Sequence, residues 1–208
     1  MNNILITWVS SGIGHFLAAK FQSEANIYWV SRRIPTDIKW NLESVDLADF
    51  KSLDDYADKL KNVSFDALIF NAWIWYFAEF EELSDEEIIA MMNLNSISPM
   101  LLLKKLVSRL PKNAKIIFIW SVSSKKFFNS WSVYQASKFA LRWFAWSIRN
   151  ELKQKVFLIN PRIVYTDFFV NDRIWIRKNQ DNETTLESIY DCVADILSWN
   201  ESRFEIDL

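Results

Sequence analysis

Apolar runs of strand length alternate with longer amphipathic stretches along the whole chain. Several of the short runs are apolar throughout, which is typical of strands covered on both faces of a parallel sheet. The alternation predicts an α/β fold, a doubly wound parallel sheet of about seven strands with helices on both faces. We expect strands at 4–7, 26–31, 43–46, 67–71, 115–119, 156–160 and 204–208, and helices at 12–23, 50–60, 84–110, 132–152 and from 184 onward.

The longest expected helix has recognisable boundaries. Ser84 is followed three residues later by Glu87, which is the spacing of a capping box, and Pro111 ends the helical pattern. A chain of 208 residues fills one domain well and is short for two. No linker or repeat interrupts the pattern, so we expect residues 1–208 to form a single domain.

Composition and charge exclude several classes of protein. The formal net charge of −2 argues against a nucleic-acid partner or a membrane surface. The single cysteine, Cys192, rules out an internal disulfide and fits a reducing compartment, and the single histidine cannot supply a metal site. The first apolar run is only as long as a strand, so we expect no signal peptide, no membrane-spanning helix and a cytoplasmic location.

The first strand leads through a short polar loop into a helix. The loop runs from Thr7 to Gly14, and Gly12 and Gly14 stand where the helix begins. Such a loop allows the backbone N–H groups of a helix N-terminus to bind a pyrophosphate. The usual pattern has a further glycine four residues before Gly12, and this chain has Trp8 there.

Tryptophan is abundant where glycine would be useful. The chain has 2 glycines and 11 tryptophans, whereas average usage predicts about 15 glycines in this length. Positions that read as turns or loops, where glycine's conformational freedom matters, instead carry tryptophan; they are Trp8, Trp29, Trp40, Trp73, Trp75, Trp131 and Trp199. We infer that most or all of the tryptophans stand where the working protein has glycine.

Two origins would give this pattern. One is a stop-type codon that the source organism translates as glycine and that the given sequence shows as tryptophan. The other is deliberate substitution of glycine by tryptophan. Overpacking a filled site costs about 1–3 kcal/mol and a left-handed side chain about 1–2 kcal/mol more, so many such sites would rival a total stability of roughly 5–15 kcal/mol. For any single position the alternative is an ordinary core tryptophan.

A second group of residues carries acid–base chemistry. Tyr134 and Lys138 are four residues apart, so a helix places them on one face. A neighbouring ammonium favours the phenolate and would lower the tyrosine pKa toward the range useful in carbonyl reduction. Ser121 ends a predicted parallel strand, at the edge where open α/β sheets bind ligands, and can hydrogen-bond a substrate oxygen.

These motifs together resemble the short-chain dehydrogenase/reductase family over essentially the whole chain. The loop from Thr7 to Gly14 is similar to the family's Thr-Gly-x-x-x-Gly-x-Gly motif, and Asn71-Ala72-Trp73 is similar to its Asn-Ala-Gly. The resemblance implies a Rossmann-type NAD(P)-binding domain whose catalytic residues are Ser121, Tyr134, Lys138 and Asn95. Asn93 is the alternative to Asn95 if the register differs by two residues.

The resemblance also implies a set of cofactor-binding positions. Thr166 matches the position that contacts the nicotinamide carboxamide, while Arg162 departs from the glycine that the family has there. The expected cofactor-binding residues are Thr7, Trp8, Ser10, Ser11, Gly12, Ile13, Gly14, Ser31, Arg32, Arg33, Asp46, Leu47, Asn71, Ala72, Trp73, Tyr134, Lys138, Pro161, Ile163 and Thr166.

The choice of cofactor follows from charge. In dinucleotide-binding domains an acidic residue about 20 positions after the glycine-rich loop binds the ribose 2′-hydroxyl of NAD, whereas an arginine accommodates the 2′-phosphate of NADP. Counting on from Gly12 reaches Arg32, between Ser31 and Arg33. Two guanidinium groups suit a phosphate dianion, so we expect NADP(H) rather than NAD(H). The alternative is a solvated basic turn.

The expected function is an NADP(H)-dependent oxidoreductase that transfers a hydride between the nicotinamide and a small carbonyl or alcohol substrate. The resemblance also implies a homodimer or homotetramer formed through the long helices at 84–110 and 132–152. The alternative is a non-catalytic NADP-binding or scaffold protein of the same fold. That alternative gains weight if Trp8 and Trp73 are the residues of the working protein.

Overall fold

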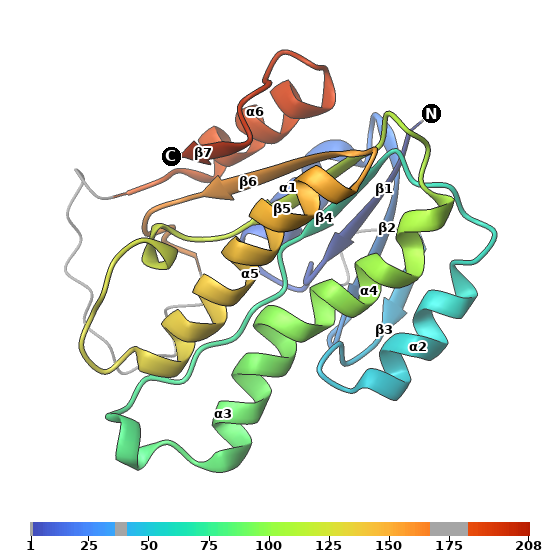
Figure 1. The fold of residues 1–208 in the computed structure, drawn as a ribbon. Coiled ribbons are helices and arrows are strands. Elements are labelled where there is room, and N and C mark those ends of the chain that lie inside the picture. The colour runs from blue at the N-terminus through green and yellow to red at the C-terminus, as the bar shows by residue number, and fades with distance from the viewer. Residues whose placement is uncertain (1, 36–40, 167–182) are drawn as a thin grey trace.

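Seven parallel strands form one twisted sheet in the computed structural model, which describes residues 2–35, 41–166 and 183–208 (Figure 1). The spatial order is β3-β2-β1-β4-β5-β6-β7, so the order reverses beside β1 and the chain fills the sheet outward in both directions. The strands are β1 (Asn2–Thr7), β2 (Ala25–Ser31), β3 (Leu42–Ser44), β4 (Ala67–Phe70), β5 (Lys115–Ile119), β6 (Lys155–Asn160) and β7 (Glu205–Asp207).

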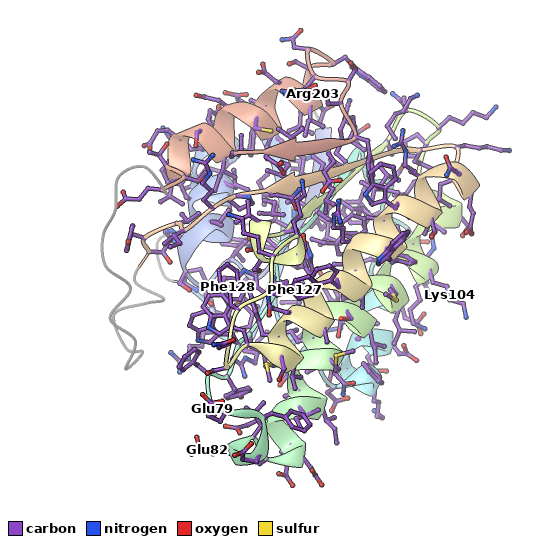
Figure 2. All side chains as sticks on the ribbon, turned by 60° about the vertical axis from the view of Figure 1, so that its left-hand side comes forward. Glu79, Glu82, Lys104, Phe127, Phe128 and Arg203 are labelled. Atoms are coloured by element: carbon purple, nitrogen blue, oxygen red, sulfur yellow. The ribbon has the colours of Figure 1, made fainter. Side chains whose placement is uncertain are left out.

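Helices cover both faces of this sheet. On one face α1 (Gly12–Phe21) and α6 (Leu186–Leu197) bury Leu17 and Ile196 against the strands. On the other face α2 (Phe50–Lys59), α4 (Ser98–Leu106) and α5 (Ser132–Glu151) bury Leu53, Leu102 and Leu141. Figure 2 shows the side chains filling the space between these layers, with Lys104 on an outer surface. The predicted doubly wound α/β architecture is therefore confirmed.

The helix predicted over 84–110 is interrupted. The capping box is present, because the Ser84 hydroxyl accepts from the Glu87 N–H and the Glu87 carboxylate accepts from the Ser84 N–H. From there α3 (Asp85–Met92) continues into one π-helical turn at Asn93–Ile97 before α4 begins. Such turns insert an extra residue and frequently mark functional sites, and this turn carries Asn95.

The backbone separates the tryptophans into two kinds. Trp8 and Trp199 have φ values of 60° and 65°, in the left-handed region that favours glycine. Trp131 precedes α5 at φ −122° and needs no such freedom. Trp29 lies within β2, close to its end at Ser31, is fully buried in the core and does not have a positive φ. Trp40 lies outside the described residues.

The glycine-like backbone at positions 8 and 199 supports the inference that glycine belongs there. For the tryptophans with ordinary backbone conformations the inference stays a prediction. Among the described residues, none of the helices combines the length and the apolar character needed to cross a membrane.

Candidate active site

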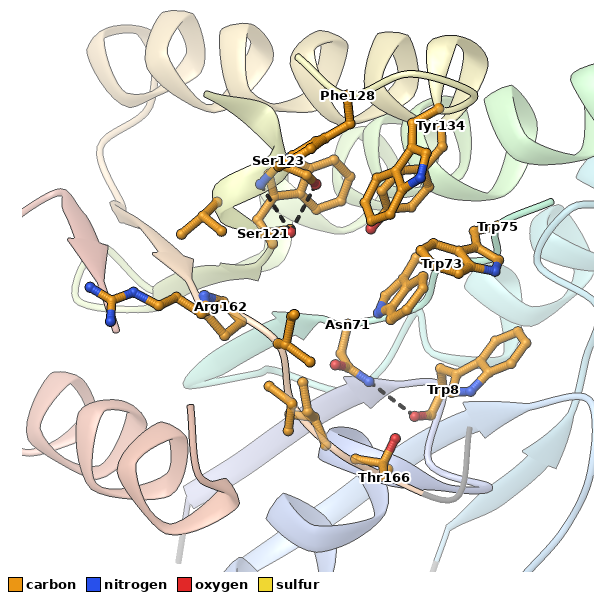
Figure 3. A pocket seen from close by; sticks show the side chains of 18 of the residues that line it. Trp8, Asn71, Trp73, Trp75, Ser121, Ser123, Phe128, Tyr134, Arg162 and Thr166 are labelled. Carbon is orange, nitrogen blue, oxygen red and sulfur yellow. Dashed lines mark hydrogen bonds between the residues drawn. The ribbon is translucent and has the colours of Figure 1, made fainter. Parts of the chain in front are cut away.

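A cavity of about 370 Å³ opens at the carboxyl ends of β1, β4, β5 and β6 (Figure 3). This is the edge at which open α/β sheets bind ligands. Of the residues predicted from the sequence, the cavity is lined by Trp8, Ser11, Gly12, Ile13, Asn71, Trp73, Ser121, Tyr134, Pro161, Ile163 and Thr166. The fold therefore brings together residues that are far apart in the chain.

The loop between β1 and α1 is held by β4. The Thr7 hydroxyl accepts hydrogen bonds from the N–H groups of Asn71 (2.9 Å) and Ala72 (3.0 Å), and the Asn71 amide donates to the Trp8 carbonyl at 3.1 Å. A Cβ on Gly14 would lie 2.0 Å from that carbonyl oxygen, so only glycine fits there. Gly12 has φ +61°, which again favours glycine. These restraints leave the first turn of α1 facing the cavity.

Trp8 connects this cavity to a smaller one beside it. Its indole contacts the Arg32 guanidinium, whose carbon lies 5.1 Å from the ring centroid. The smaller cavity is lined by Trp8, Val30, Ser31, Arg32, Val45, Asp46, Leu47 and Leu94. The positions predicted to surround the adenine end of a cofactor therefore lie together, apart from Arg33, which is exposed and does not line this cavity.

Ser121 lies two residues after the end of β5 and caps the short turn Val122–Ser124. Its hydroxyl oxygen accepts hydrogen bonds from the Ser123 N–H at 3.1 Å and from the Ser123 hydroxyl at 2.8 Å. Tyr134 enters the same cavity from the first turn of α5, and Figure 3 shows the two side chains on the same side of the pocket. The predicted pairing of Ser121 with Tyr134 in one cleft is thus a feature of the structure.

The Tyr134 phenol is buried. Burial raises its pKa above the ordinary value of 10.0, and interactions with Ser123 and Ser121 lower it by less. The sequence predicted a phenol pKa lowered by Lys138, and that is wrong for the chain in this structure, because desolvation outweighs the favourable contacts. The phenol is therefore protonated at neutral pH.

Lys138, which was predicted to bind the cofactor, is fully buried and does not line the cavity. Its Nζ has no hydrogen-bond partner among the described residues and instead lies 3.8 Å from the Trp120 ring centroid, 4.8 Å from that of Trp73 and 5.2 Å from that of Tyr134. Burial lowers the pKa of Lys138 well below 10.5. Burying an amine without a hydrogen-bond partner costs free energy, so the position of Lys138 favours a polar partner that hydrogen-bonds its Nζ.

Asn95 lies in the π-helical turn and is fully buried. Its side chain donates to the Ile74 carbonyl and accepts from the Ile74 N–H, both at 2.8 Å, and it donates to the Ser137 hydroxyl at 2.9 Å. These bonds join the loop after β4 to α5 beside Lys138. The alternative, Asn93, uses its main-chain carbonyl to accept from the Ser98 hydroxyl at 2.8 Å, and the role of Asn95 stays a prediction.

The segment after β6 closes the cavity. Thr166 faces Gly12, with its Oγ1 3.4 Å from where a Gly12 Cβ would lie. Arg162 stands at the family's glycine position but does not have the positive φ that would require glycine, and its N–H donates to the Thr184 hydroxyl at 2.9 Å. An arginine is therefore compatible with the local backbone.

Several lining residues were not predicted from the sequence. Ser123 could have been found from its place two residues after Ser121. The Trp75, Phe128 and Trp131 rings form an aromatic wall around Tyr134, with Trp131 5.8 Å from Tyr134 and 5.0 Å from Phe128 between ring centroids. No local pattern distinguishes these aromatics from core residues.

Comparison with known proteins identifies the family of this chain. The model for short chain dehydrogenases matches residues 2–177. An uncharacterized oxidoreductase of Saccharomyces cerevisiae is 40% identical over 62 residues, which are 29% of this chain and only 24% of that protein's length.

Solved structures extend the likeness in fold to the whole chain. A short chain dehydrogenase family protein from Francisella tularensis has a TM-score of 0.85 at 21% identity, covering 100% of this chain and 97% of its own. An alcohol dehydrogenase from Thermococcus sibiricus, solved with 5-hydroxy-NADP, has a TM-score of 0.85 at 21% identity, covering 100% and 96%. The matched family model and the shared architecture identify this chain as a member of the short-chain dehydrogenase/reductase family of oxidoreductases.

Proposed function

We propose that this chain is an NADP(H)-dependent oxidoreductase that interconverts a small carbonyl compound and its alcohol by a Ser-Tyr-Lys-Asn mechanism. One observation carries the proposal: a single cavity joins the N-terminal turn of α1 to the hydroxyls of Ser121 and Tyr134. The Lys138 amine, which has no hydrogen-bond partner among the described residues, lies against the rings of three lining residues, Trp73, Trp120 and Tyr134. Helix N-termini bind phosphates, and paired hydroxyls polarise a carbonyl oxygen.

The residues present fit a nicotinamide dinucleotide. Gly12 and its neighbours offer main-chain N–H groups at the start of α1, and Thr166 faces them across the cavity. The buried Lys138 amine lacks a partner among the described residues, and ribose hydroxyls would supply one. When bound, the nicotinamide supplies or accepts the hydride. Similar solved structures include one with NADH and one with NADPH, so likeness in fold does not distinguish the two coenzymes. The charged residues of this chain are what distinguish them.

Each catalytic side chain has a distinct role in this proposal. Tyr134 holds the proton that passes to the substrate oxygen in reduction and removes it in oxidation. Ser121 donates a hydrogen bond to that oxygen, and Lys138 binds the ribose and favours the phenolate once a polar partner keeps the amine charged. Asn95 supports the proton path by fixing the loop after β4 against α5.

The preference for NADP(H) rests on Arg32. Its guanidinium lies at the small cavity that also contains Ser31 and Asp46, where the adenosine ribose would bind. A guanidinium binds a phosphate dianion through charge-assisted hydrogen bonds. Arg33 adds positive charge at this end without lining the small cavity.

A second candidate function is NADP binding without catalysis, or a scaffold role. The specific observation in its favour is that Trp8 and Trp73 both line the main cavity. Their indoles lie against Arg32 and Lys138, the two cations proposed to bind the cofactor. If the indoles only keep the nicotinamide from the catalytic side chains, the chain binds NADP without turnover, and if they exclude the cofactor altogether, the scaffold role is left.

The proposal has three further parts. The chain forms a homodimer or homotetramer, residues 1–208 form a single domain, and the protein is cytoplasmic. Trp143 and Trp146 lie on the outer face of α5, 68% and 40% exposed, and glycine at both positions would leave this face with small residues against which a second copy packs. Sedimentation velocity tests the assembly: a dimer or larger species supports it, and a monomer at all concentrations contradicts it.

The enzymatic proposal is tested by following the absorbance of NADPH with a panel of aliphatic and aromatic aldehydes and ketones. We expect turnover with NADPH that exceeds turnover with NADH, and loss of the preference in Arg32→Ala. Tyr134→Phe should lower the rate by about 10²–10⁴-fold. Saturable NADPH binding without turnover of any carbonyl would favour the non-catalytic candidate instead.

A further inference from the structure

The Ser121 hydroxyl is hydrogen-bonded by one neighbouring residue in two ways. Its oxygen accepts from the Ser123 main-chain N–H at 3.1 Å and from the Ser123 side-chain hydroxyl at 2.8 Å. Ser123 is only 3% exposed and lines the cavity. The two groups that approach the Ser121 oxygen therefore come from a fixed, buried position.

A serine hydroxyl has one proton to donate and two lone pairs that accept. Both accepting positions of Ser121 are filled by Ser123, so its remaining capacity is to donate its own proton. The Ser123 hydroxyl contacts the Ser121 hydroxyl, and both serine hydroxyls also interact with the Tyr134 phenol. The Ser121 hydroxyl is therefore able to donate its own proton within the cavity that Tyr134 also lines.

The turn that carries these residues is held independently of the Ser123 hydroxyl. The Ser124 hydroxyl donates to the Ser121 carbonyl at 2.9 Å, and the Ser124 N–H donates to the same carbonyl at 3.0 Å. The N–H of Lys125 closes the turn on the Val122 carbonyl at 3.0 Å. Removing the Ser123 hydroxyl should therefore change the hydrogen-bonding state of Ser121 without unfolding the turn.

We propose that Ser123 is a positioning residue that fixes the Ser121 hydroxyl as a hydrogen-bond donor to the substrate oxygen. The inference rests on the proposed function, since it deepens the role of Ser121 in that reaction. A donor is needed most when the carbonyl oxygen acquires negative charge, because hydrogen bonds to a developing oxyanion strengthen in the transition state. Ser123 should accordingly affect kcat more than KM.

The kinetic test compares Ser123→Ala with Ser124→Ala in the full chain, using NADPH and a carbonyl compound that the enzyme reduces. We expect Ser123→Ala to lower kcat about tenfold while KM and the Kd for NADPH stay unchanged. Ser123→Thr, which keeps the hydroxyl, should recover most of the lost kcat. Ser124→Ala should lower the unfolding temperature and leave kcat near that of the parent chain. An unchanged kcat in Ser123→Ala, or a loss confined to KM, would overturn the proposal.

A second measurement needs no turnover. Amide hydrogen exchange of the cofactor-free chain reports whether the Ser123 N–H is bonded to the Ser121 oxygen. We expect exchange at Ser123 to be at least about tenfold slower in the parent chain than in Ser121→Ala. Equal rates would refute the arrangement even in an active enzyme, whereas slow exchange in a chain that reduces no carbonyl would locate the failure in the proposed function.

Discussion

The guanidinium carbon of Arg32 lies over the Trp8 indole, 5.1 Å from its centroid. A cation–π contact of this kind is worth about 0.5–1 kcal/mol at an exposed site. It keeps the Arg32 guanidinium, which we assign to the cofactor phosphate, against a ring that itself lines the main cavity. The same tryptophan has the left-handed backbone conformation that glycine adopts without strain.

Replacing Trp8 with glycine should therefore strengthen cofactor binding. Trp8→Gly frees the Arg32 guanidinium and removes the indole from the cavity, so we expect the Kd for NADPH to fall at least about tenfold. Fluorescence titration with NADPH measures the change. Trp199→Gly is the matched control, because Trp199 has a similar φ of 65° but does not line the cavity. Equal Kd values in Trp8→Gly and the parent chain would contradict this account of Trp8.

Two exposed tryptophans should respond oppositely to glycine. Trp199 has a left-handed backbone, so Trp199→Gly should raise the free energy of unfolding by about 1 kcal/mol through relief of strain. Trp143 lies within α5, where glycine costs about 1 kcal/mol, so Trp143→Gly should lower it. Urea denaturation measures both values. A loss of stability in Trp199→Gly as large as that in Trp143→Gly would speak against a glycine position at 199.

The inference that glycine replaces tryptophan in the working protein has a direct chemical test. The sequence as written corresponds to 24.7 kDa. Each exchange of tryptophan for glycine lowers the mass, and the eleven positions together lower it far beyond the error of mass spectrometry. We expect the intact protein purified from its natural source to be lighter by most or all of these exchanges. A mass equal to that of the written sequence would contradict the inference.

Glu205 should make the fold sensitive to acid. Its carboxylate accepts hydrogen bonds from Arg142 and Asn160 at 2.9 Å and pairs with Lys125 at 2.9 Å, which ties β7 to the segment following Ser121. Burial raises the pKa of Glu205, but these partners outweigh it and lower the pKa to about 2. Because the folded-state pKa lies below the ordinary 4.5, the stabilisation is present above pH 4.5 and is lost as the pH falls toward 2.

Glu205→Gln should therefore reduce the unfolding free energy at pH 7 and flatten its decline between pH 5 and pH 2. Arg142→Met removes the partner instead of the carboxylate and should also destabilise the fold at neutral pH. Denaturation curves recorded across this range measure both variants. If Glu205→Gln loses stability on acidification as steeply as the parent chain, the ion-pair account is wrong.

The fold followed closely from the pattern of apolar residues. The predicted parallel sheet and most helix boundaries agree with the structure, because runs such as 116–119 are apolar throughout and helix starts such as Ser84 carry local caps. The π-helical turn at Asn93–Ile97 was not predictable, since its cause is tertiary. The Asn95 side chain there bonds to Ile74 and Ser137, which are distant in sequence.

Site residues were predictable from the sequence where their roles depend on the spacing between residues of one helix or strand. Tyr134 and Lys138 follow this rule, and Ser121 lies at the strand end that the topology requires. The burial of Lys138 was not predictable, because it depends on Trp73 and Trp120 from other segments. For the same reason, the desolvation that raises the pKa of the Tyr134 phenol was not predictable from the sequence.

The proposed function requires that the main cavity bind a nicotinamide dinucleotide beside Tyr134 and that Lys138 contact the bound cofactor. Isothermal titration of NADPH tests this binding in four proteins: the parent chain, Trp8→Gly, Lys138→Met and the double variant Trp8→Gly/Lys138→Met. We predict saturable binding that Trp8→Gly strengthens and that Lys138→Met weakens at least about tenfold. Absence of saturable binding in both the full chain and Trp8→Gly, or binding that Lys138→Met leaves unchanged, would contradict the claim.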